Sequence, residues 1–388
     1  MAIGAGARVT TRYVAEVTRG TTPGSPAMKF LRATTRDPNL EKDVLESEEV
    51  RSTRQVSDQR HGFNRVVGQL GFQLSRADFD EITEIALGGT WAAVTTGSAT
   101  IAVDGPTQKF TRSGGSFLTD GFRVGHVINS TGFSNGGNNV SGSAVTITVL
   151  TATEMTVVGA TLVTEGSAAA RTITAPGKSL EIGTSLKTVT LERAFEDLTK
   201  FQVFRGVAVN NYRLTATPER MINVLMDLIG MSSAAISGTP LDASPDAPVD
   251  SSPFAPFDGS ILEAGTLIAV VTSLDVTIAN NRTVSPVIGS KFTPDIFDGT
   301  ARVDGTMTAL FESETLWNKF FNETESALRV RFNDPNGTDY WNVMLHRVKY
   351  NGGAINPPLE GPVVMNMPIT ALEHATYRQA LTIQRSNT

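Results

Sequence analysis

Two stretches of the chain carry the same pattern, and this repeat decides the fold. Residues 62–70 read Gly-Phe-Asn-Arg-Val-Val-Gly-Gln-Leu, and residues 299–307 read Gly-Thr-Ala-Arg-Val-Asp-Gly-Thr-Met. An internal repeat indicates a duplicated structural unit. Two copies of one unit predict a builder of rings or fibres rather than an enzyme with a single pocket. The residues that recur in register are Gly62, Arg65, Val66 and Gly68 in the first copy, and Gly299, Arg302, Val303 and Gly305 in the second.

Each copy predicts a strand followed by an amphipathic helix. Apolar side chains at alternate positions of residues 66–74 predict a strand with one buried face. Gly68 weakens the strand preference in its middle, so it indicates a bend or a close backbone approach. Asp78 and Glu81 have the spacing of a capping box at the start of a helix. Helical spacing predicts that the following apolar side chains belong to the core: Phe79, Ile82, Ile85, Ala86, Leu316, Trp317, Phe320 and Phe321.

The composition indicates a folded, β-rich chain and excludes several functions. The chain has 388 residues, of which 35 are Gly and 18 are Pro. Its formal net charge of -6 makes it a poor candidate for gripping nucleic acid, since such binding comes largely from Lys and Arg. Cysteine is absent, which removes disulfides and thiol catalysis. We expect no signal peptide in the first residues and no membrane segment, because the longest apolar run, residues 267–271, is too short.

Composition also divides the chain. Residues 95–175 are dominated by Thr, Gly, Ser, Val and Ala, with short β-forming runs between Gly/Asn turns. This predicts a small all-β domain, and no counterpart follows the second helix, so we expect an insertion into the first module. Residues 232–258 are rich in Ser, Ala and Pro, which is typical of a linker. The first module then comprises residues 1–94 and 176–231, and the second comprises residues 259–388.

Residues 41–61 are highly charged, and both signs mingle. One interpretation is a solvated loop, and the other is a polar loop that docks on a neighbouring subunit. Mixed signs favour register and specificity over raw affinity. The candidate docking residues are Glu46, Glu48, Glu49, Arg51, Arg54, Asp58 and Arg60.

No catalytic constellation is found. The four histidines are scattered, without the spacing of a metal site or a triad. A Gly-x-Ser-x-Gly string at residues 132–136 is followed by an Asn/Gly turn, whereas a nucleophile elbow needs a helix there. Residues 334–339 resemble a calcium loop but lack its downstream Glu, so a β-turn explains them better. We therefore expect no enzyme, no metal and no cofactor.

Several short motifs, taken in order, carry a family resemblance. They are Tyr13, Glu16 and Gly20-Thr21-Thr22-Pro23; Ser47-Glu48-Glu49-Val50-Arg51; Arg54-Gln55-Val56; His61-Gly62; Phe254-Ala255-Pro256-Phe257-Asp258-Gly259; Gly289-Ser290; and Gly305-Thr306-Met307-Thr308-Ala309-Leu310-Phe311. Together they resemble the tail tube (major tail) proteins of long, non-contractile-tailed bacteriophages. The resemblance covers both modules.

The resemblance implies two tandem tail-tube modules in a mainly β chain. Each would be a pair of packed antiparallel sheets flanked by one helix, and the sheets of all modules would join into a barrel around a channel. Three chains would complete a pseudo-sixfold ring, and rings would stack into a tube. The loop at residues 41–61 would dock on the adjacent ring, with residues 280–298 as its less charged second-module equivalent. The insertion at residues 95–175 would decorate the outside.

The resemblance also implies a location and partners. The protein would assemble in the host cytoplasm and reside in the tail of the virion. Its partners would be other copies of itself, the tape-measure protein, the tail terminator and the tail-tip proteins. Phage DNA would pass through the channel without specific binding, and an acidic lumen would repel its phosphates.

Other functions stay open at this point. The chain could be a secretion-type tube, a tail terminator or a capsid decoration protein. A different class is a virion protein that binds or hydrolyses host carbohydrate through its insertion. The insertion has no Trp or Tyr and only four Phe, which disfavours a sugar platform: Phe110, Phe117, Phe122 and Phe133.

Overall fold

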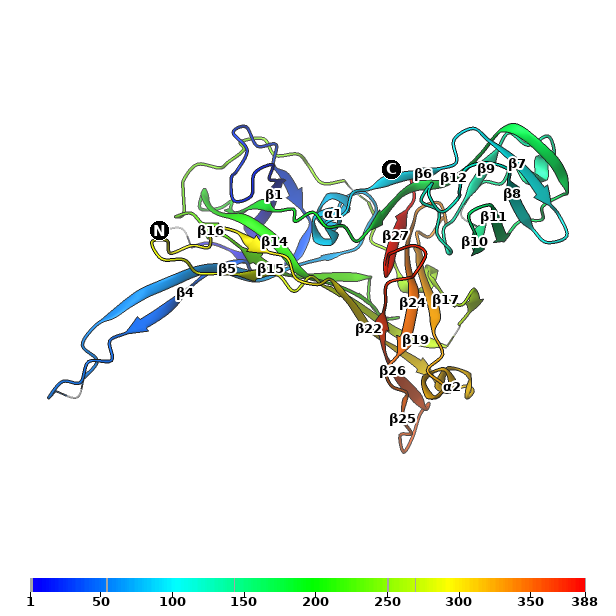
Figure 1. The fold of residues 1–388 in the computed structure, drawn as a ribbon. Helices are drawn as coiled ribbons and strands as arrows, with labels where there is room; N and C mark the ends of the chain where they lie inside the picture. The colour runs from blue at the N-terminus through cyan, green and yellow to red at the C-terminus, as the bar shows by residue number, and fades with distance from the viewer. Residues whose placement is uncertain (1–2, 54, 143, 250, 269, 388) are drawn as a thin grey trace.

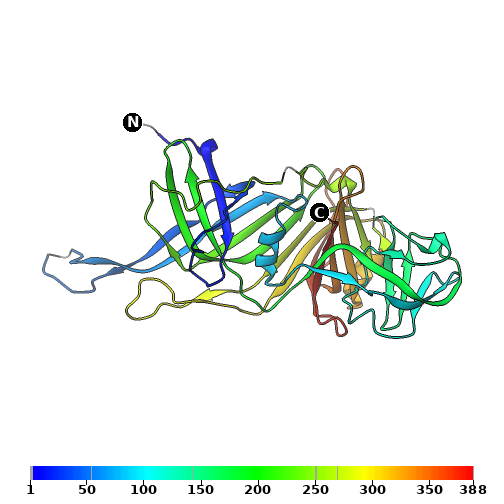
Figure 2. The same ribbon diagram turned by 90° about the horizontal axis from the view of Figure 1, so that it is seen from above.

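The computed structural model describes residues 3–53, 55–142, 144–249, 251–268 and 270–387. Over these residues the chain is mainly β, and the described α-helices are α1 (Asp80–Leu87) and α2 (Thr315–Phe321) (Figure 1, Figure 2). The predicted mainly β class with large antiparallel sheets is confirmed. Each helix follows a long strand of the repeat, as the sequence indicated. The predicted place of Phe321 in the core is wrong, because Phe321 ends α2, stacks on Trp317 and is 67% exposed.

A continuous antiparallel sheet, called here the long sheet, runs through the molecule (Figure 1). At one edge β3 and β4 both pair with β5, and at the other edge β25 pairs with β26. In spatial order its strands are β3 (Ala33–Arg36) with β4 (Asn39–Glu46), β5 (Gln59–Gln73), β15 (Asn223–Gly230), β14 (Lys200–Ala216), β19 (Val271–Ala279), β22 (Arg302–Leu310), β26 (Val364–Ala371) and β25 (Ala354–Asn356).

A second layer packs on one face of the long sheet. On the first module it consists of β1 (Val9–Ala15), β2 (Lys29–Leu31), β13 (Val189–Phe195), the first part of β14 and β16 (Ser232–Ser233). On the second module it consists of β17 (Ser260–Glu263), β18 (Thr266–Leu267), β23 (Ser326–Asn333), β24 (Tyr340–Tyr350) and β27 (Leu381–Arg385). One hydrophobic core lies between the layers and extends through both modules.

Two tryptophans connect the modules inside this core. Trp91, just after α1, and Trp341 of β24 meet edge to face with ring centroids 5.6 Å apart. Arg385 of β27 lies over the Trp91 ring at 5.3 Å and pairs with Asp80 of α1 at 2.7 Å. These contacts bury apolar area and a charge pair at one place, so they hold the helix of the first module against the strands of the second.

Helix α1 begins differently from the sequence prediction. It starts at Asp80, and no side chain caps its first turn. The Asp78 carboxylate instead pairs with Arg32 and accepts a hydrogen bond from the Val249 amide at 2.9 Å. The predicted capping box is therefore wrong, because these tertiary partners take the carboxylate. At its other end Gly88 has φ 65, a left-handed conformation that glycine adopts without strain, and the helix ends there.

The recurring glycines of the two long strands have a common physical cause. A Cβ on Gly68 would lie 2.3 Å from the Asp37 carbonyl oxygen, and one on Gly305 would lie 2.4 Å from the Asp275 carbonyl oxygen. Asp37 and Asp275 lie at corresponding places on the neighbouring strand. Both glycines therefore permit the same close approach of two backbones.

The segment after α1 forms strands with a separate hydrophobic core between Val94 and Ala175. This region lies at the end of the molecule away from the β4–β5 hairpin (Figure 1). Strand β12 continues past residue 175, the predicted end of the insertion, and there it pairs with β27 of the second module. The strands are β6 (Ala92–Thr95), β7 (Ala99–Asp104), β8 (Lys109–Arg112), β9 (Asn129–Thr131), β10 (Thr146–Leu150), β11 (Glu154–Val158) and β12 (Glu165–Glu181).

Buried hydrogen bonds fix this region on the second module. The Gln384 amide accepts from the Val127 amide at 2.9 Å and donates to the Val127 carbonyl at 3.0 Å. The Asn342 amide donates to the Gly125 carbonyl at 2.9 Å. Buried hydrogen bonds are directional, so these bonds favour one orientation of the region on the second module.

Two buried histidines at this contact should make stability depend on pH. Burial lowers the pKa of both His126 and His346 from 6.5 to about 3, and nearby Arg123 adds to the effect. Between about pH 6.5 and 3 the unfolded chain binds protons that the folded chain does not. Stability should therefore fall as the pH falls through this window, by roughly 1.4 kcal/mol per pH unit for each histidine.

Denaturant unfolding between pH 7 and pH 4 measures this slope. His126→Gln should give a shallower slope than the wild type, whereas His61→Gln, at an exposed position, serves as the matched control. A wild-type slope that His126→Gln leaves unchanged would contradict the assignment.

Candidate functional site: the hairpin, faces and edges of the long sheet

The β4–β5 hairpin projects beyond the rest of the long sheet (Figure 1, Figure 2). Strand β15 accompanies β5 only as far as Val66, so residues 59–65 of β5 extend past it together with β4. At about 3.3 Å per residue this extension reaches roughly 20 Å, before the tip at residues 47–58 is added. The charged segment predicted as a loop therefore forms an arm, in which residues 41–46 and 59–61 belong to the two strands and residues 47–58 form the tip.

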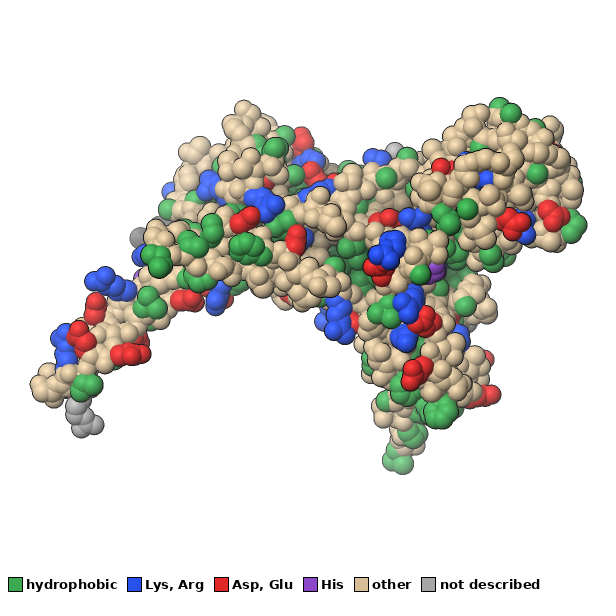
Figure 3. Space-filling model, viewed as in Figure 1, with side chains coloured by type: hydrophobic (Ala, Val, Ile, Leu, Met, Phe, Trp, Pro, Cys, Tyr) green, Lys and Arg blue, Asp and Glu red, His purple; other side chains and the backbone are tan. Residues whose placement is uncertain are grey.

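The predicted docking residues that the structure describes lie on this arm and are exposed to solvent. Charges of both signs are visible along the arm (Figure 3). The side chains of Arg51 and Glu49 pair at 2.9 Å, and those of Arg60 and Asp58 pair at 3.5 Å. Exposed pairs of this kind contribute little stability, so they are free to be replaced by contacts to another subunit. Glu46 ends β4, Glu48 is in the tip, and Arg54 lies outside the described residues.

Sequence reasoning missed the apolar side chains of the same arm. Val50 is 100% exposed at the tip, and Leu45 and Val56 are 60% and 64% exposed. With Val44 of β4, which is 49% exposed, the arm has four exposed aliphatic side chains, and such a group indicates a surface that another chain covers. The charges around them dominated the composition of the segment, and this hid the apolar signal.

The second-module loop at residues 280–298 lies beside the arm. It contains the short strands β20 (Thr283–Val284) and β21 (Ile296–Phe297). The Asn64 amide of β5 donates to the Lys291 carbonyl at 2.7 Å, and Arg19 pairs with Asp295 at 2.8 Å. Both modules therefore project a loop on the same side of the molecule, although only the first is a long arm (Figure 2).

The repeated positions lie in β5 and β22, with one exception. Gly62, Arg65, Val66 and Gly68 lie within β5, and Arg302, Val303 and Gly305 lie within β22. Gly299 precedes β22. The two valines are buried in the core, whereas each arginine pairs with a carboxylate on its own side of the sheet: Arg65 with Glu41 at 3.1 Å, and Arg302 with Asp304 at 2.7 Å.

The long sheet has one core face and one face that no described segment of the chain covers, called here the open face. Side chains alternate between the two faces along each strand. In β15, half-buried and fully buried side chains alternate strictly. The open face is mainly polar. Its side chains include Gln69, Asn211, Arg213, Thr215, Asn223, Leu225, Asp227, Asp275, Thr277, Arg302, Asp304, Thr306, Thr308, Asn366 and Thr370.

The arginines in the middle of the open face are neutralised by aspartates. Arg213 of β14 pairs with Asp275 of the adjacent strand β19 at 2.6 Å, whereas Arg302 pairs with Asp304 of its own strand. Asp227 has no arginine of its own and accepts hydrogen bonds from the amides of Gln69 and Asn211, both at 2.8 Å. Carboxylates therefore outnumber guanidinium groups among these side chains.

Strands β14 and β19 join the two modules, and we call this pairing the seam. Asn211 to Ala216 pair antiparallel with Ala279 to Leu274. The Asn280 amide strengthens the junction by donating to the Val209 and Ala86 carbonyls, both at 2.9 Å. The seam makes one sheet from residues that are 58 to 68 positions apart in sequence, from Ala216 with Leu274 to Asn211 with Ala279.

The long sheet ends in two unpaired edges. Within the described ranges, β3 and β4 pair with β5 alone, and β25 pairs with β26 alone. Pro38 separates β3 from β4, and proline is tolerated at edges because it has no amide hydrogen to donate. It also limits indiscriminate pairing of a free edge.

Each free edge corresponds to one strand of the seam. Arg36 of β3 opposes Leu70 of β5, and Leu274 of β19 opposes Met307 of β22. Leu70 and Met307 hold the same place in the sequence repeat, so the β3–β4 edge is the first-module equivalent of β19.

The other edge corresponds to β14 by the same reasoning. Gly71 and Thr308 are equivalent in the repeat. Arg213 of β14 pairs with a residue of β15 that pairs in turn with Gly71. In the same way, Ala354 of β25 pairs with a residue of β26 that pairs in turn with Thr308. The β25 edge is therefore the second-module equivalent of the end of β14.

Free edges that reproduce an internal junction define a self-assembling structural protein. The sequence matches the family model described as phage tail tube protein over residues 6–371. The match covers nearly the whole chain, so this chain belongs to the phage tail tube protein family. No curated protein matches the sequence.

The family assignment confirms the coarse functional predictions. The protein is a structural component of a bacteriophage tail, and membership implies self-assembly into a tube and a non-enzymatic role. No helix in the described part of the chain has the length and apolar character needed to cross a membrane. Among the same residues no group of three or more His, Asp or Glu is arranged to hold a metal ion.

Proposed function

We propose that three chains close into a ring through their free edges, and that such rings stack into the tail tube. The observation that carries this proposal is the seam. Inside one chain, module one joins module two through β14 and β19. Equivalent edges remain unpaired at the two ends of the same sheet, so module two of one chain can join module one of the next in the same way.

The internal seam supplies the register of the proposed junction. Arg213 opposes Thr277 within the chain. Their equivalents on the free edges are Ala354 and Asn39, which should therefore face each other between neighbouring chains. Pairing the edges removes unsatisfied backbone groups, as closure of a sheet into a barrel does.

The open face would then line the channel. DNA binding depends on cationic side chains that neutralise phosphates. Here Arg213 and Arg302 are already neutralised by aspartates, and Asp227 adds negative charge. Such a wall would let phage DNA pass during ejection into the host without holding it.

The remaining assignments are part of the same proposal. Residues 95–175 pack on β24 and β27 in the second layer, away from the open face, so they would decorate the outside of the tube. The arm would dock on the adjacent ring. The ends of the tube would contact the tail terminator and the tail-tip proteins, the tape-measure protein would occupy the channel, and assembly would take place in the host cytoplasm.

Electron microscopy and native mass measurement test the proposal. The purified protein should form hollow tubes of uniform width, and isolated rings should have the mass of three chains. A mass of six chains would contradict the trimeric ring. Rings of the expected mass that never stack would instead favour the tail terminator function.

Cysteine cross-linking tests the junction, because the chain contains no cysteine of its own. The double variant Asn39→Cys and Ala354→Cys should oxidise to a covalent trimer, visible on a denaturing gel. The matched control combines Ala354→Cys with Thr34→Cys, which stands five residues out of register on the same edge, and should stay uncross-linked. Equal cross-linking of both pairs would exclude the seam register.

A further inference from the structure

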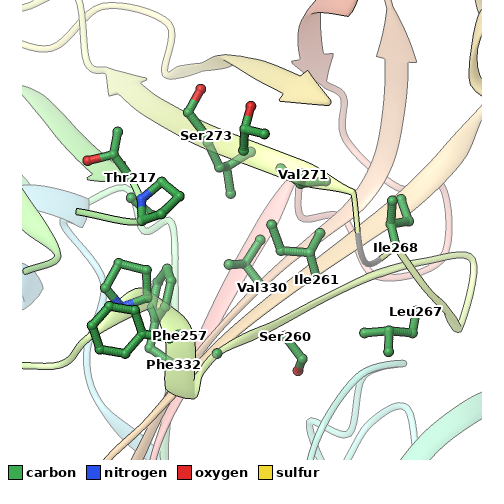
Figure 4. Close-up of a pocket in the computed structure, with 16 residues that line it drawn as sticks. Thr217, Phe257, Ser260, Ile261, Leu267, Ile268, Val271, Ser273, Val330 and Phe332 are labelled. Carbon is green, nitrogen blue, oxygen red and sulfur yellow. The ribbon is translucent and has the colours of Figure 1, made fainter. Parts of the chain in front are cut away.

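An apolar pocket lies where the two modules meet, at one end of the long sheet (Figure 4). Its volume is about 350 Å³, and none of its lining residues is charged. The first module contributes the turn after β14, and the second contributes β17, β18 and the start of β19. The side chains that shape it include Thr217, Phe257, Leu267, Ile268, Val271 and Phe332.

Two large apolar side chains stand exposed at this pocket. Phe257 is 78% exposed and Leu267 is 61% exposed. Single exposed apolar side chains are ordinary, but two beside an uncharged pocket indicate a surface that is covered in the functional state. We call this surface the seam pocket.

The seam pocket and the arm lie at opposite ends of β5. The turn after β14 lies at the level of the end of β5, because Thr215 pairs with Asn223 and Asn223 pairs with Gln73. The tip of the arm precedes Gln59, at the start of β5. Strand β5 has 15 residues, so about 50 Å separate the two ends. A chain cannot place its own arm in its own pocket.

We propose that the tip of the arm, anchored by Val50, occupies the seam pocket of a chain in the next ring. This inference rests on the proposed stacking of rings. Head-to-tail stacking brings one end of a subunit against the opposite end of another, which is the contact that grows filaments. The arm reaches roughly 20 Å past the sheet, so its tip extends beyond the body of its own subunit.

The tip of the arm and the seam pocket match in chemical character and in their number per chain. The tip presents aliphatic side chains, and the pocket is apolar. Glu219 and Arg220 directly follow the lining residue Pro218 and are both exposed, and their opposite charges suit the mixed charges that surround Val50. Each chain has one arm and one seam pocket, because the pocket is built from both modules, so every arm in a stack finds one pocket.

Disulfide formation in assembled tubes tests this contact. The double variant Val50→Cys and Leu267→Cys is first assembled under reducing conditions and imaged, and is then oxidised. Because each chain links to two others in a stack, a denaturing gel should show a ladder that continues beyond three chains. A control with Val50→Cys and Val149→Cys, the latter on the exposed surface of the inserted region, should show no ladder.

Two outcomes of this experiment would overturn the proposal. One is the formation of normal tubes without a ladder. The other is a ladder from Ile288→Cys with Leu267→Cys in place of the Val50 pair, which would assign the pocket to the second-module loop. Absence of tubes from the wild-type protein would overturn the proposed function and not this contact alone.

A charge in the pocket gives an independent measurement. Leu267→Asp should leave ring mass unchanged and raise the protein concentration needed for tubes at least tenfold, because a carboxylate would be desolvated against Val50. Val149→Asp introduces the same charge at a similarly exposed position and should leave that concentration unchanged. Unimpaired tubes from Leu267→Asp would refute the contact.

Discussion

Replacing Asn356 by aspartate should prevent rings from closing while each chain still folds. In the internal seam, Thr215 faces Asp275 and its hydroxyl donates to that carboxylate at 3.0 Å. The equivalents on the free edges are Asn356 and Asp37. Asn356→Asp would therefore place two carboxylates opposite each other at each junction between chains.

The expected effect grows with the number of junctions. Like charges directly opposite on neighbouring strands cost about 0.2–1 kcal/mol. Three junctions together would cost up to about 3 kcal/mol, which is roughly a hundredfold in ring formation. Analytical ultracentrifugation of Asn356→Asp should show monomers at concentrations where the wild type forms rings.

Asn356→Lys is the matched variant with the opposite expectation. A lysine would face Asp37, so ring formation should be kept or strengthened. Asn356 is exposed in the single chain, and neither variant should change its thermal unfolding. If the aspartate and lysine variants assembled alike, Asn356 would not face a carboxylate at the junction.

Replacing Gly305 by alanine should destabilise the fold itself. The new Cβ would lie 2.4 Å from the Asp275 carbonyl oxygen and 3.2 Å from a side-chain carbon of Ile369. Strands on both sides of β22 would have to move, and the nearest atom is backbone that cannot rotate away. Overpacking of this kind costs about 1–3 kcal/mol, and we expect a loss near 3 kcal/mol.

Denaturant unfolding measures this loss. Gly166→Ala is the matched control, because a Cβ there meets no heavy atom within 4 Å. The control should unfold within about 0.5 kcal/mol of the wild type, as surface substitutions usually do. Equal stability of both alanine variants would show that the approach of β19 to β22 is looser than the structure indicates.

The sequence repeat predicted the long strands and the helices because both patterns are local. Alternating apolar residues indicate a strand with one buried face, and Phe79 with Ile82 and Ile85 indicate a helical stripe. The capping box failed for a non-local reason. Asp78 found Arg32 and the Val249 amide, which lie near it only after the chain has folded.

The candidate site was predicted in part. The charged segment was recognised, but its shape as a projecting arm and its exposed Val50 were not. The open face was also missed. In β15, Asn223, Leu225 and Asp227 alternate with buried residues, but most residues of this strand are apolar and the alternation was not recognised. Which of the two alternating sets faces a core depends on what packs against the strand, and the strand alone does not contain that information.

The amino-acid sequence by itself determined the family, the mainly β class and the repeat of the long-strand pattern, because each depends on residue identities along the chain. The tertiary structure alone decided how the copies are joined. Strand pairing depends on hydrogen bonds between segments far apart in sequence, such as Arg213 and Thr277, and a shift of one residue would exchange the two faces of a strand. Only the folded sheet shows that the strands at its two free edges are equivalent to the two strands that pair in its interior seam.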